Sequence, residues 1–157
     1  MRISSALPPR RTPRVYLIDT NVVSERRKQA RANPGVRQFF ESVAEAGTPI
    51  YLSAISVGEL RRGVELIRHR GDLDQVGLLE AWLVALLEQF ADNILTFDAD
   101  AAQVWGRLRV PRPEHEIDKQ IAAIALVNDL TVVTRNTADF KATGVRLIDP
   151  FVPDAAP

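Results

Sequence analysis

The 157-residue sequence contains no cysteine, which excludes disulfide bonds, thiolate zinc sites and a cysteine nucleophile. Its longest hydrophobic runs, such as residues 121–127, are far shorter than the ~20 residues that a membrane span needs. Residues 1–14 are basic and contain proline, and they lack the apolar stretch of a secretory signal. We therefore expect a cytoplasmic protein that does not bind or span a membrane.

The sequence also lacks net charge, because 20 basic side chains balance 20 acidic ones. The overall charge therefore does not indicate nucleic-acid binding. The two signs are unevenly spread: residues 1–70 carry 13 Lys and Arg against 6 Asp and Glu, whereas residues 71–157 carry 7 against 14. This asymmetry permits a basic surface next to an acidic pocket.

Hydrophobic residues make up 46% of the chain and charged residues 25%, which is typical of a globular domain. The length suits one domain, which we place at residues 15–151. We expect residues 1–14 to form a flexible basic extension and residues 152–157 to form a tail.

Short apolar strands alternate with helical patterns along the chain. The strands are expected at residues 15–19, 50–54, 94–97, 131–134 and 145–148. The helices are expected at residues 20–30, 36–47, 56–70, 73–90, 98–110 and 117–128, with a short turn around Phe140. Such alternation predicts an α/β fold in which helices cover both faces of a parallel sheet.

Four acidic residues stand out by their position relative to these elements. Asp19 closes the first strand, Glu59 lies in the first turn after the second strand, and Asp139 follows the fourth strand closely. Asp118 begins the helix that leads into the fourth strand. Because ligands of open α/β sheets bind beyond the carboxyl ends of the strands, we expect all four side chains at that edge.

A cluster of four carboxylates suits a hard divalent cation. Mg²⁺ and Mn²⁺ are bound by one or two carboxylates together with water, and further acids bind through those waters. The cation relieves the repulsion between the acids and can activate water for hydrolysis of a phosphodiester. Hydroxyl and amide side chains nearby could complete such a pocket; these are Thr20, Asn21, Thr134 and Asn136.

Each acid also has a purely structural interpretation. Asp19 could cap the next helix, and Ser56 with Glu59 fits a capping box. Asp118 lies where the helix dipole favours a negative charge, and Asp139 could cap a turn. These alternatives remain open at the level of sequence.

Other residues fit catalytic roles less well. His69 and His115 lie in polar surroundings and are expected to be ordinary surface residues. The sequence has no glycine-rich phosphate loop, and no Ser-His-Asp arrangement can be singled out. A haloacid-dehalogenase-like phosphatase would need a second aspartate two residues after Asp19, where this sequence has Asn21.

Two further features suggest binding partners. Arg61, Arg62 and Arg135 could contact backbone phosphates or an acidic partner. The helix expected at residues 73–90 is apolar over more than one face, so we expect it to pack against a second copy of the chain or another protein.

Four segments resemble the PIN-domain VapC-type toxins, in particular the FitB-like subgroup. They are LIDTNVVSE at 17–25, SAISVGELRRG at 53–63, DKQIAAIA at 118–125 and VTRNTADF at 133–140. The resemblance covers residues 15–151 with all four motifs in order. It implies a PIN-like three-layer α/β/α fold whose parallel sheet has about five strands.

The resemblance also implies an activity and partners. The expected activity is a Mg²⁺- or Mn²⁺-dependent endoribonuclease, the toxin of a type II toxin–antitoxin pair, with Asp19, Glu59, Asp118 and Asp139 as its catalytic and metal-binding quartet. The expected partners are a cognate antitoxin, an RNA substrate and a second copy in a homodimer, with operator DNA bound only through the antitoxin.

One departure from the family pattern concerns the residue after Asp118. Lys119 occupies a position where small or apolar residues are commoner, and it places a cation near the expected site. The alternative function is a catalytically weak or inactive PIN-like module that acts through its protein partner. All four acids are present, which favours the enzyme.

Overall fold

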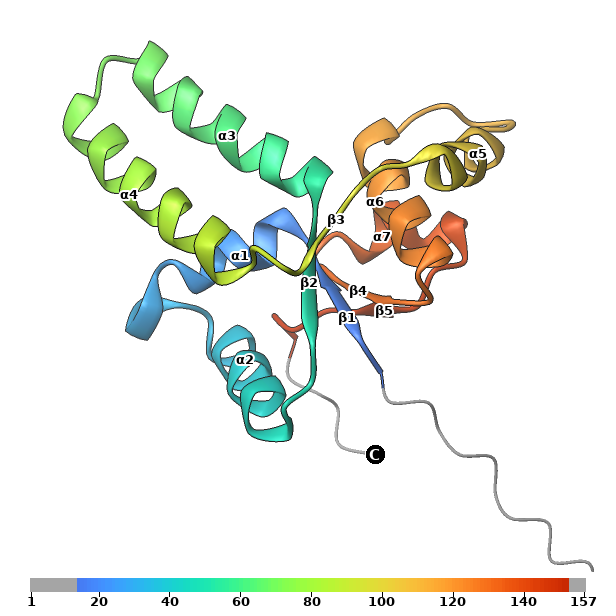
Figure 1. Ribbon diagram of the computed structural model, residues 1–157, viewed down its shortest axis with the longest axis horizontal. Helices are drawn as coiled ribbons and strands as arrows, with labels where there is room; N and C mark the ends of the chain where they lie inside the picture. The colour runs from blue at the N-terminus through green and yellow to red at the C-terminus, as the bar shows by residue number, and fades with distance from the viewer. Residues whose placement is uncertain (1–13, 153–157) are drawn as a thin grey trace, which may run out of the picture.

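The computed structural model describes residues 14–152 and contains a five-stranded parallel sheet (Figure 1). The strand order is β3-β2-β1-β4-β5. The strands are β1 Tyr16–Ile18, β2 Ile50–Ser53, β3 Ile94–Leu95, β4 Thr131–Val133 and β5 Leu147–Ile148. The predicted parallel α/β fold is therefore confirmed. The expectations for residues 1–13 and 153–157 concern positions outside the described residues.

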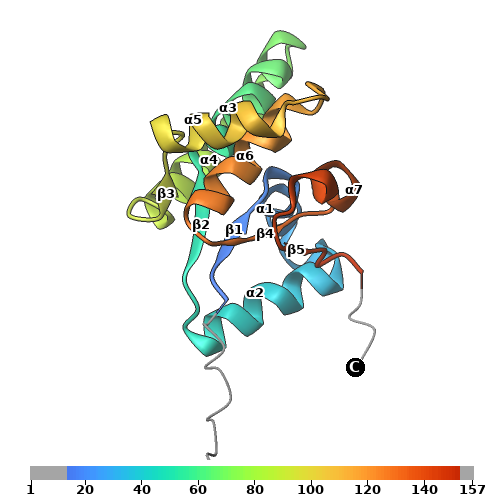
Figure 2. The ribbon, with the colours of Figure 1, turned by 90° about the vertical axis from the view of Figure 1, so that its right-hand side faces the viewer.

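Helices cover both faces of this sheet, as Figures 1 and 2 show. On one face lie α1 Thr20–Arg26, α2 Pro34–Ala46, α3 Ala54–His69 and α4 Leu73–Gln89. On the other lie α5 Ala99–Leu108, α6 Glu116–Val127 and the short α7 Thr137–Phe140. Two 3-10 turns, Gln29–Arg31 and Lys141–Thr143, follow α1 and α7.

The central strands are buried on both faces, which explains their continuous apolar sequences. Leu17 and Val132 pack into the core under α5, α6 and α7, whereas the next residues, Ile18 and Val133, pack into the core under α1 to α4. All four side chains are completely buried. Alternate residues of one strand thus serve two separate cores.

Each expected helix differs from the structure by one or more residues at an end, and two of these differences have a clear local cause. The helix expected to reach residue 30 ends at Arg26, because residues 27–31 are exposed and offer no large apolar side chain to bury. The helix expected to begin at residue 56 begins at Ala54, since Ser53 at the end of β2 caps it by accepting the Ser56 backbone N–H at 2.9 Å.

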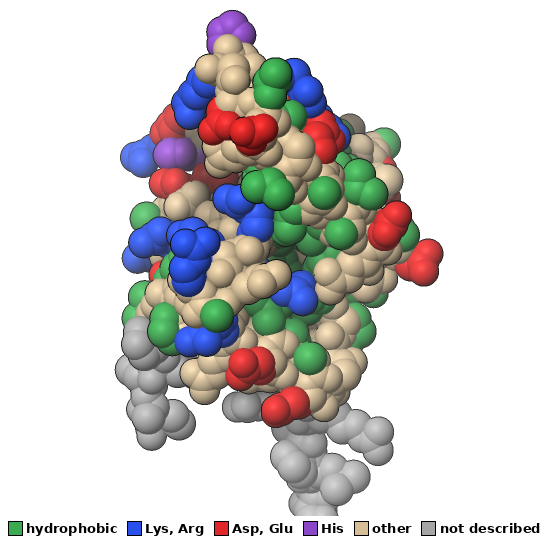
Figure 3. Space-filling model, turned by 90° about the vertical axis from the view of Figure 1, so that its left-hand side faces the viewer, with side chains coloured by type: hydrophobic (Ala, Val, Ile, Leu, Met, Phe, Trp, Pro, Cys, Tyr) green, Lys and Arg blue, Asp and Glu red, His purple; other side chains and the backbone are tan. Residues whose placement is uncertain are grey.

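The prediction that α4 is apolar on more than one side is confirmed by its exposed residues. Leu79 and Leu83 are buried against the sheet side, but Leu78 is 74% exposed and Val84 is 53% exposed. Leu73 at the start of the helix is 67% exposed. Figure 3 shows hydrophobic side chains gathered on this side of the molecule, with Lys and Arg side chains beside them.

Ion pairs join α4 to its neighbour α3. Arg61 of α3 binds both carboxylate oxygens of Glu80 at 2.7 and 3.1 Å, and Arg68 binds Glu80 at 2.7 Å. The two helices form the antiparallel hairpin at one side of Figure 1. Among residues 14–152, no helix is both long and apolar enough to cross a membrane.

Candidate active site

The four predicted acids all lie beyond the carboxyl ends of the central strands, and Asp118 and Asp139 have carboxylate oxygens within 4.8 Å of each other. Asp19 follows β1 directly, Glu59 lies in the second turn of α3, Asp118 is in the first turn of α6 and Asp139 is in α7. The pKa of Asp118 is raised to about 6, first by burial and then by the negative charges of Asp19, Asp139 and Glu59. The acids are therefore close enough to repel one another.

Strand register explains why Asp19 lies at the centre of this group. Ile18 is paired with Val133, and the Asp19 backbone N–H donates to the Val133 carbonyl at 2.9 Å. The next residue of that segment, Thr134, is completely buried, and its Oγ1 donates to Asp19 Oδ2 at 2.7 Å. Two adjacent strands thus fix the position of one carboxylate.

Asp19 is also the N-cap of α1, so its structural and site roles coexist. Its Oδ1 accepts the Thr20 backbone N–H at 2.8 Å, and its Oδ2 accepts from Asn21 Nδ2 at 3.3 Å. Burial raises the pKa of Asp19, while the hydrogen bonds from Thr134, Thr20 and Asn21 partly offset that effect. The side chain is 3% exposed.

Glu59 does not form the expected capping box. Because α3 begins at Ala54, Glu59 is too far along the helix to reach the Ser56 backbone, and its Oε1 instead accepts from Thr20 Oγ1 at 3.1 Å. Burial and the charge of Asp19 raise the pKa of Glu59, whereas the bond from Thr20 and the charge of Arg62 lower it. Its side chain thus faces α1 and the acidic pocket.

A histidine that the sequence did not single out joins the group. One ligand atom each from His115, Asp118 and Asp139 lies within 4.8 Å of the other two. His115 is exposed, as expected for a surface residue, but its Nε2 is 3.9 Å from Asp139 Oδ1. Its spacing of three residues before Asp118, at the start of a helix, is the signal that sequence analysis could have used.

The supporting polar residues differ in what they contribute. Thr20, Asn21 and Thr134 donate to the carboxylates described above, and Asn21 Oδ1 also accepts the Arg135 backbone N–H at 3.1 Å. Asn136 contributes its backbone N–H, which donates to Thr134 Oγ1 at 3.0 Å. The network therefore links the residues after β1 to those after β4.

The basic residues near the site fall into two groups. Arg61 is bound to Glu80, as described, and Lys119 is 5% exposed with its Nζ donating to the Arg112 carbonyl at 2.5 Å. The ammonium group of Lys119 is thus hydrogen-bonded to the loop that contains Arg112. Arg62 lies near Glu59, and the exposed Arg135 stacks its guanidinium 4.7 Å from the centre of the Phe151 ring.

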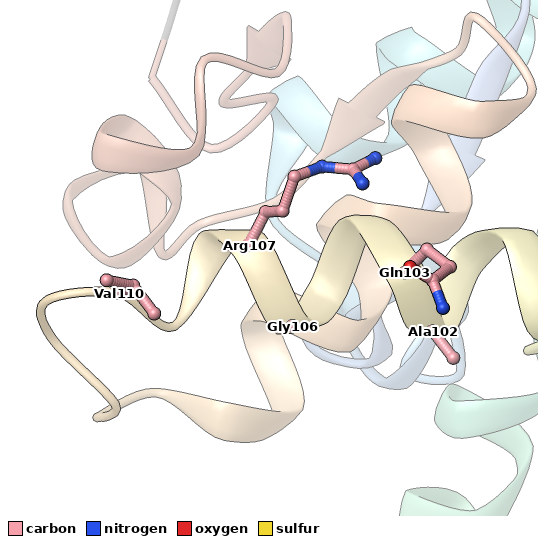
Figure 4. A pocket seen from close by; sticks show the side chains of 5 residues that line it. All are labelled: Ala102, Gln103, Gly106, Arg107 and Val110. Carbon is pink, nitrogen blue, oxygen red and sulfur yellow. The ribbon is translucent and has the colours of Figure 1, made fainter.

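A separate hollow runs along α5 and contains none of the four acids. Figure 4 shows the residues that line it, which are Ala102, Gln103, Gly106, Arg107 and Val110. Because these residues bring only one titratable side chain, the hollow offers no acid–base or metal chemistry comparable with that of the acidic cluster.

Replacing Thr134 by valine is expected to weaken Mn²⁺ binding by about tenfold or more, because partners that orient a metal ligand commonly contribute 10–100-fold to affinity. Valine keeps the buried shape but removes the donor to Asp19 Oδ2. Thr134→Ser keeps the hydroxyl and is expected to bind Mn²⁺ within about threefold of wild type. Titration calorimetry on both variants checks this, and equal affinities for valine and wild type would contradict it.

The fold and the site together define a parallel α/β protein with a cluster of carboxylates at the carboxyl edge of its sheet. A model of the PIN domain family matches residues 16–145. The chain belongs to the PIN domain family.

Two curated relatives and one solved structure are similar over almost their whole length. The toxin FitB of Neisseria gonorrhoeae is 38% identical over 142 residues, covering 87% of this chain and 99% of FitB. The VapC ribonuclease Y4jK of Sinorhizobium fredii is 33% identical over 146 residues, covering 88% of this chain and 99% of Y4jK. The structure of FitAB bound to an IR36 DNA fragment contains a chain with TM-score 0.75 and 32% identity, covering 88% of this chain and 96% of that one.

Proposed function

We propose that this protein is a divalent-metal-dependent endoribonuclease and the toxin of a type II toxin–antitoxin pair. The observation that carries the proposal is the gathering of the four acids at one edge of the sheet, where burial first and then the charges of Asp19, Asp139 and Glu59 raise the pKa of Asp118 to about 6. The similarity to a toxin and to a ribonuclease supports the reaction class.

The donor set fits Mg²⁺ or Mn²⁺. Both ions prefer oxygen ligands, and a cluster of partly buried carboxylates that repel one another is stabilised by a divalent charge. Asp19 and Asp118 would hold the ion directly, while Glu59 and Asp139 would bind through its waters or hold a second ion. When bound, the ion activates water and neutralises charge that develops on the phosphate.

The protein's own residues orient and protect this chemistry. Thr134, Thr20 and Asn21 donate to the Asp19 carboxylate and hold it in place. Thr20 links Asp19 to Glu59, because its backbone N–H donates to Asp19 and its Oγ1 donates to Glu59. Arg62 and Arg135 lie at the rim, where they would bind backbone phosphates of RNA.

Cleavage of RNA by the purified protein is expected to stop when EDTA is added and to return when excess Mn²⁺ is supplied. A binding module that acts only through its partner would not cleave RNA under either condition. Cleavage that continues at full rate in EDTA would contradict the metal-dependent mechanism. RNA incubated with an equal amount of the Asp19→Asn protein from the same purification controls for contaminating nucleases.

We also propose the partners that this function requires. FitAB occurs as a complex on DNA, and by analogy this chain would bind a cognate antitoxin that carries the complex to operator DNA in the cytoplasm. The exposed apolar residues Leu78 and Val84 of α4 suit a contact with the antitoxin or with a second copy in a homodimer.

A further inference from the structure

We propose that Asp139 and Asp118 hold the second ion allowed for above, that His115 is a further ligand of that ion, and that its imidazole makes the site prefer Mn²⁺ to Mg²⁺. The proposal rests on the metal-dependent function above and specifies which ion that function uses. Carboxylates and water suit both ions, whereas imidazole nitrogen suits first-row transition metals and is a poor ligand for Mg²⁺. One nitrogen donor in an oxygen site therefore changes the preference between them.

The separation between His115 and Asp139 fits a shared ion. In an octahedral site with bonds of about 2.1–2.2 Å, adjacent ligand atoms lie about 3 Å apart and opposite ones about 4.3 Å apart. The distance of 3.9 Å between His115 Nε2 and Asp139 Oδ1 lies between these two values, so one ion can bond to both atoms at an angle wider than a right angle. The corresponding atom of Asp118 is also within 4.8 Å of both.

A direct ion pair between the two side chains explains the same distance less well. Hydrogen bonds between imidazolium and carboxylate groups are about 2.7–2.9 Å long, so at 3.9 Å the atoms are not hydrogen-bonded. An ion bonded to both atoms would join the two side chains in one site without a hydrogen bond between them.

The segment that carries His115 is held in place on both sides. The carbonyl of His115 accepts the Lys119 backbone N–H at 2.9 Å, and the carbonyl of Glu116 accepts from Trp105 Nε1 at 3.2 Å. Arg109 binds the Glu116 carboxylate at 2.8 Å. The bond from Lys119 Nζ to the Arg112 carbonyl secures the loop before His115. The backbone that carries the imidazole is therefore already fixed before an ion binds.

The sequence offers a matched control for this residue. The sequence has two histidines, and the other one, His69, is exposed at the end of α3. His115 has φ of 58°, in the left-handed region that asparagine tolerates well, so His115→Asn is expected to fold normally. His69→Asn makes the same chemical change away from the site.

Pulsed EPR of Mn²⁺ bound to the untagged protein tests the ligand directly, because the ¹⁴N nucleus of a coordinated imidazole modulates the echo. We expect this modulation in wild type and His69→Asn and its loss in His115→Asn. A wild-type protein that binds Mn²⁺ without nitrogen modulation, or a His115→Asn protein that retains it, would overturn the proposal.

Calorimetric titration with each ion tests the preference. We expect His115→Asn to weaken Mn²⁺ binding by roughly tenfold and Mg²⁺ binding by less than about twofold, so that their affinity ratio falls. Equal weakening of both ions would show a merely structural role and would contradict the preference. If wild type binds neither ion, the proposed nuclease function fails as well; if it binds Mn²⁺ and cleaves RNA but shows no nitrogen ligand, only the role of His115 fails.

Discussion

Replacing Asp19 by asparagine is expected to reduce RNA cleavage by at least about 100-fold, since loss of one group that stabilises transition-state charge commonly has an effect of 10²–10³. Asparagine has nearly the same shape and can keep the acceptor for the Thr20 backbone N–H, so α1 remains capped. It removes the negative charge and replaces Oδ2, the oxygen that accepts from both Thr134 and Asn21, by an amide nitrogen. Cleavage assays with saturating Mg²⁺ or Mn²⁺ measure the loss.

Asp98 provides the control that separates capping from catalysis. It is the N-cap of α5 and accepts the Ala101 backbone N–H at 2.9 Å, but it is not among the charges that shift the pKa of Asp118. We expect Asp98→Asn to cleave RNA at the wild-type rate. An Asp19→Asn protein that cleaves as fast as wild type would contradict the assigned role, as would equal losses in both variants.

In the absence of metal, the raised pKa of Asp118 is expected to make the stability of the folded protein depend on pH. The pKa of Asp118 is about 6 in the folded protein and near 3.8 when unfolded, so between these values the folded state binds more protons. The contribution of Asp118 to the free energy of unfolding therefore falls as pH rises from about 4 to about 6 and is constant above. A shift of two units corresponds to roughly 3 kcal/mol, which partial exposure reduces to about 1–2 kcal/mol.

Urea unfolding in EDTA at pH 4 and pH 7 measures this contribution. Asp118→Asn removes the titrating group, so we expect its stability relative to wild type to increase by about 1–2 kcal/mol between the two pH values. Taking the difference between the two proteins removes other groups, such as Glu25, whose pKa is lowered chiefly by a hydrogen bond from Lys28. Mn²⁺ at pH 7 is expected to stabilise wild type much more than Asp118→Asn. A difference that is constant with pH would contradict the repulsion.

Sequence analysis predicted the edge at which the site lies because the residues after parallel strands have a fixed place in this architecture. Asp19 and Thr134 follow β1 and β4, which pair residue by residue, so their contact follows from topology. The structure also brings Glu59, Asp118 and Asp139 to that edge, and their catalytic roles remain proposals.

Contacts between distant segments could not be predicted in the same way. The capping box that Ser56 and Glu59 fit in the sequence does not form, because Ser53 caps α3 and Glu59 accepts from Thr20, 39 residues away. His115 was set aside as a surface residue because its sequence neighbours are polar; its spacing before Asp118 was a signal, but that spacing does not show where α7 carries Asp139. The local sequence was enough to predict most helices and strands, whereas the contacts between distant side chains depend on how those helices and strands pack.

Anomalous scattering from a crystal of the protein soaked in Mn²⁺ locates the bound ion. We expect a peak among Asp19, Glu59, Asp118 and Asp139, with oxygens of Asp19 and Asp118 at bonding distance of about 2.1–2.3 Å. A site without a peak at saturating Mn²⁺, or ions bound elsewhere while the four carboxylates stay unbridged, would contradict this expectation.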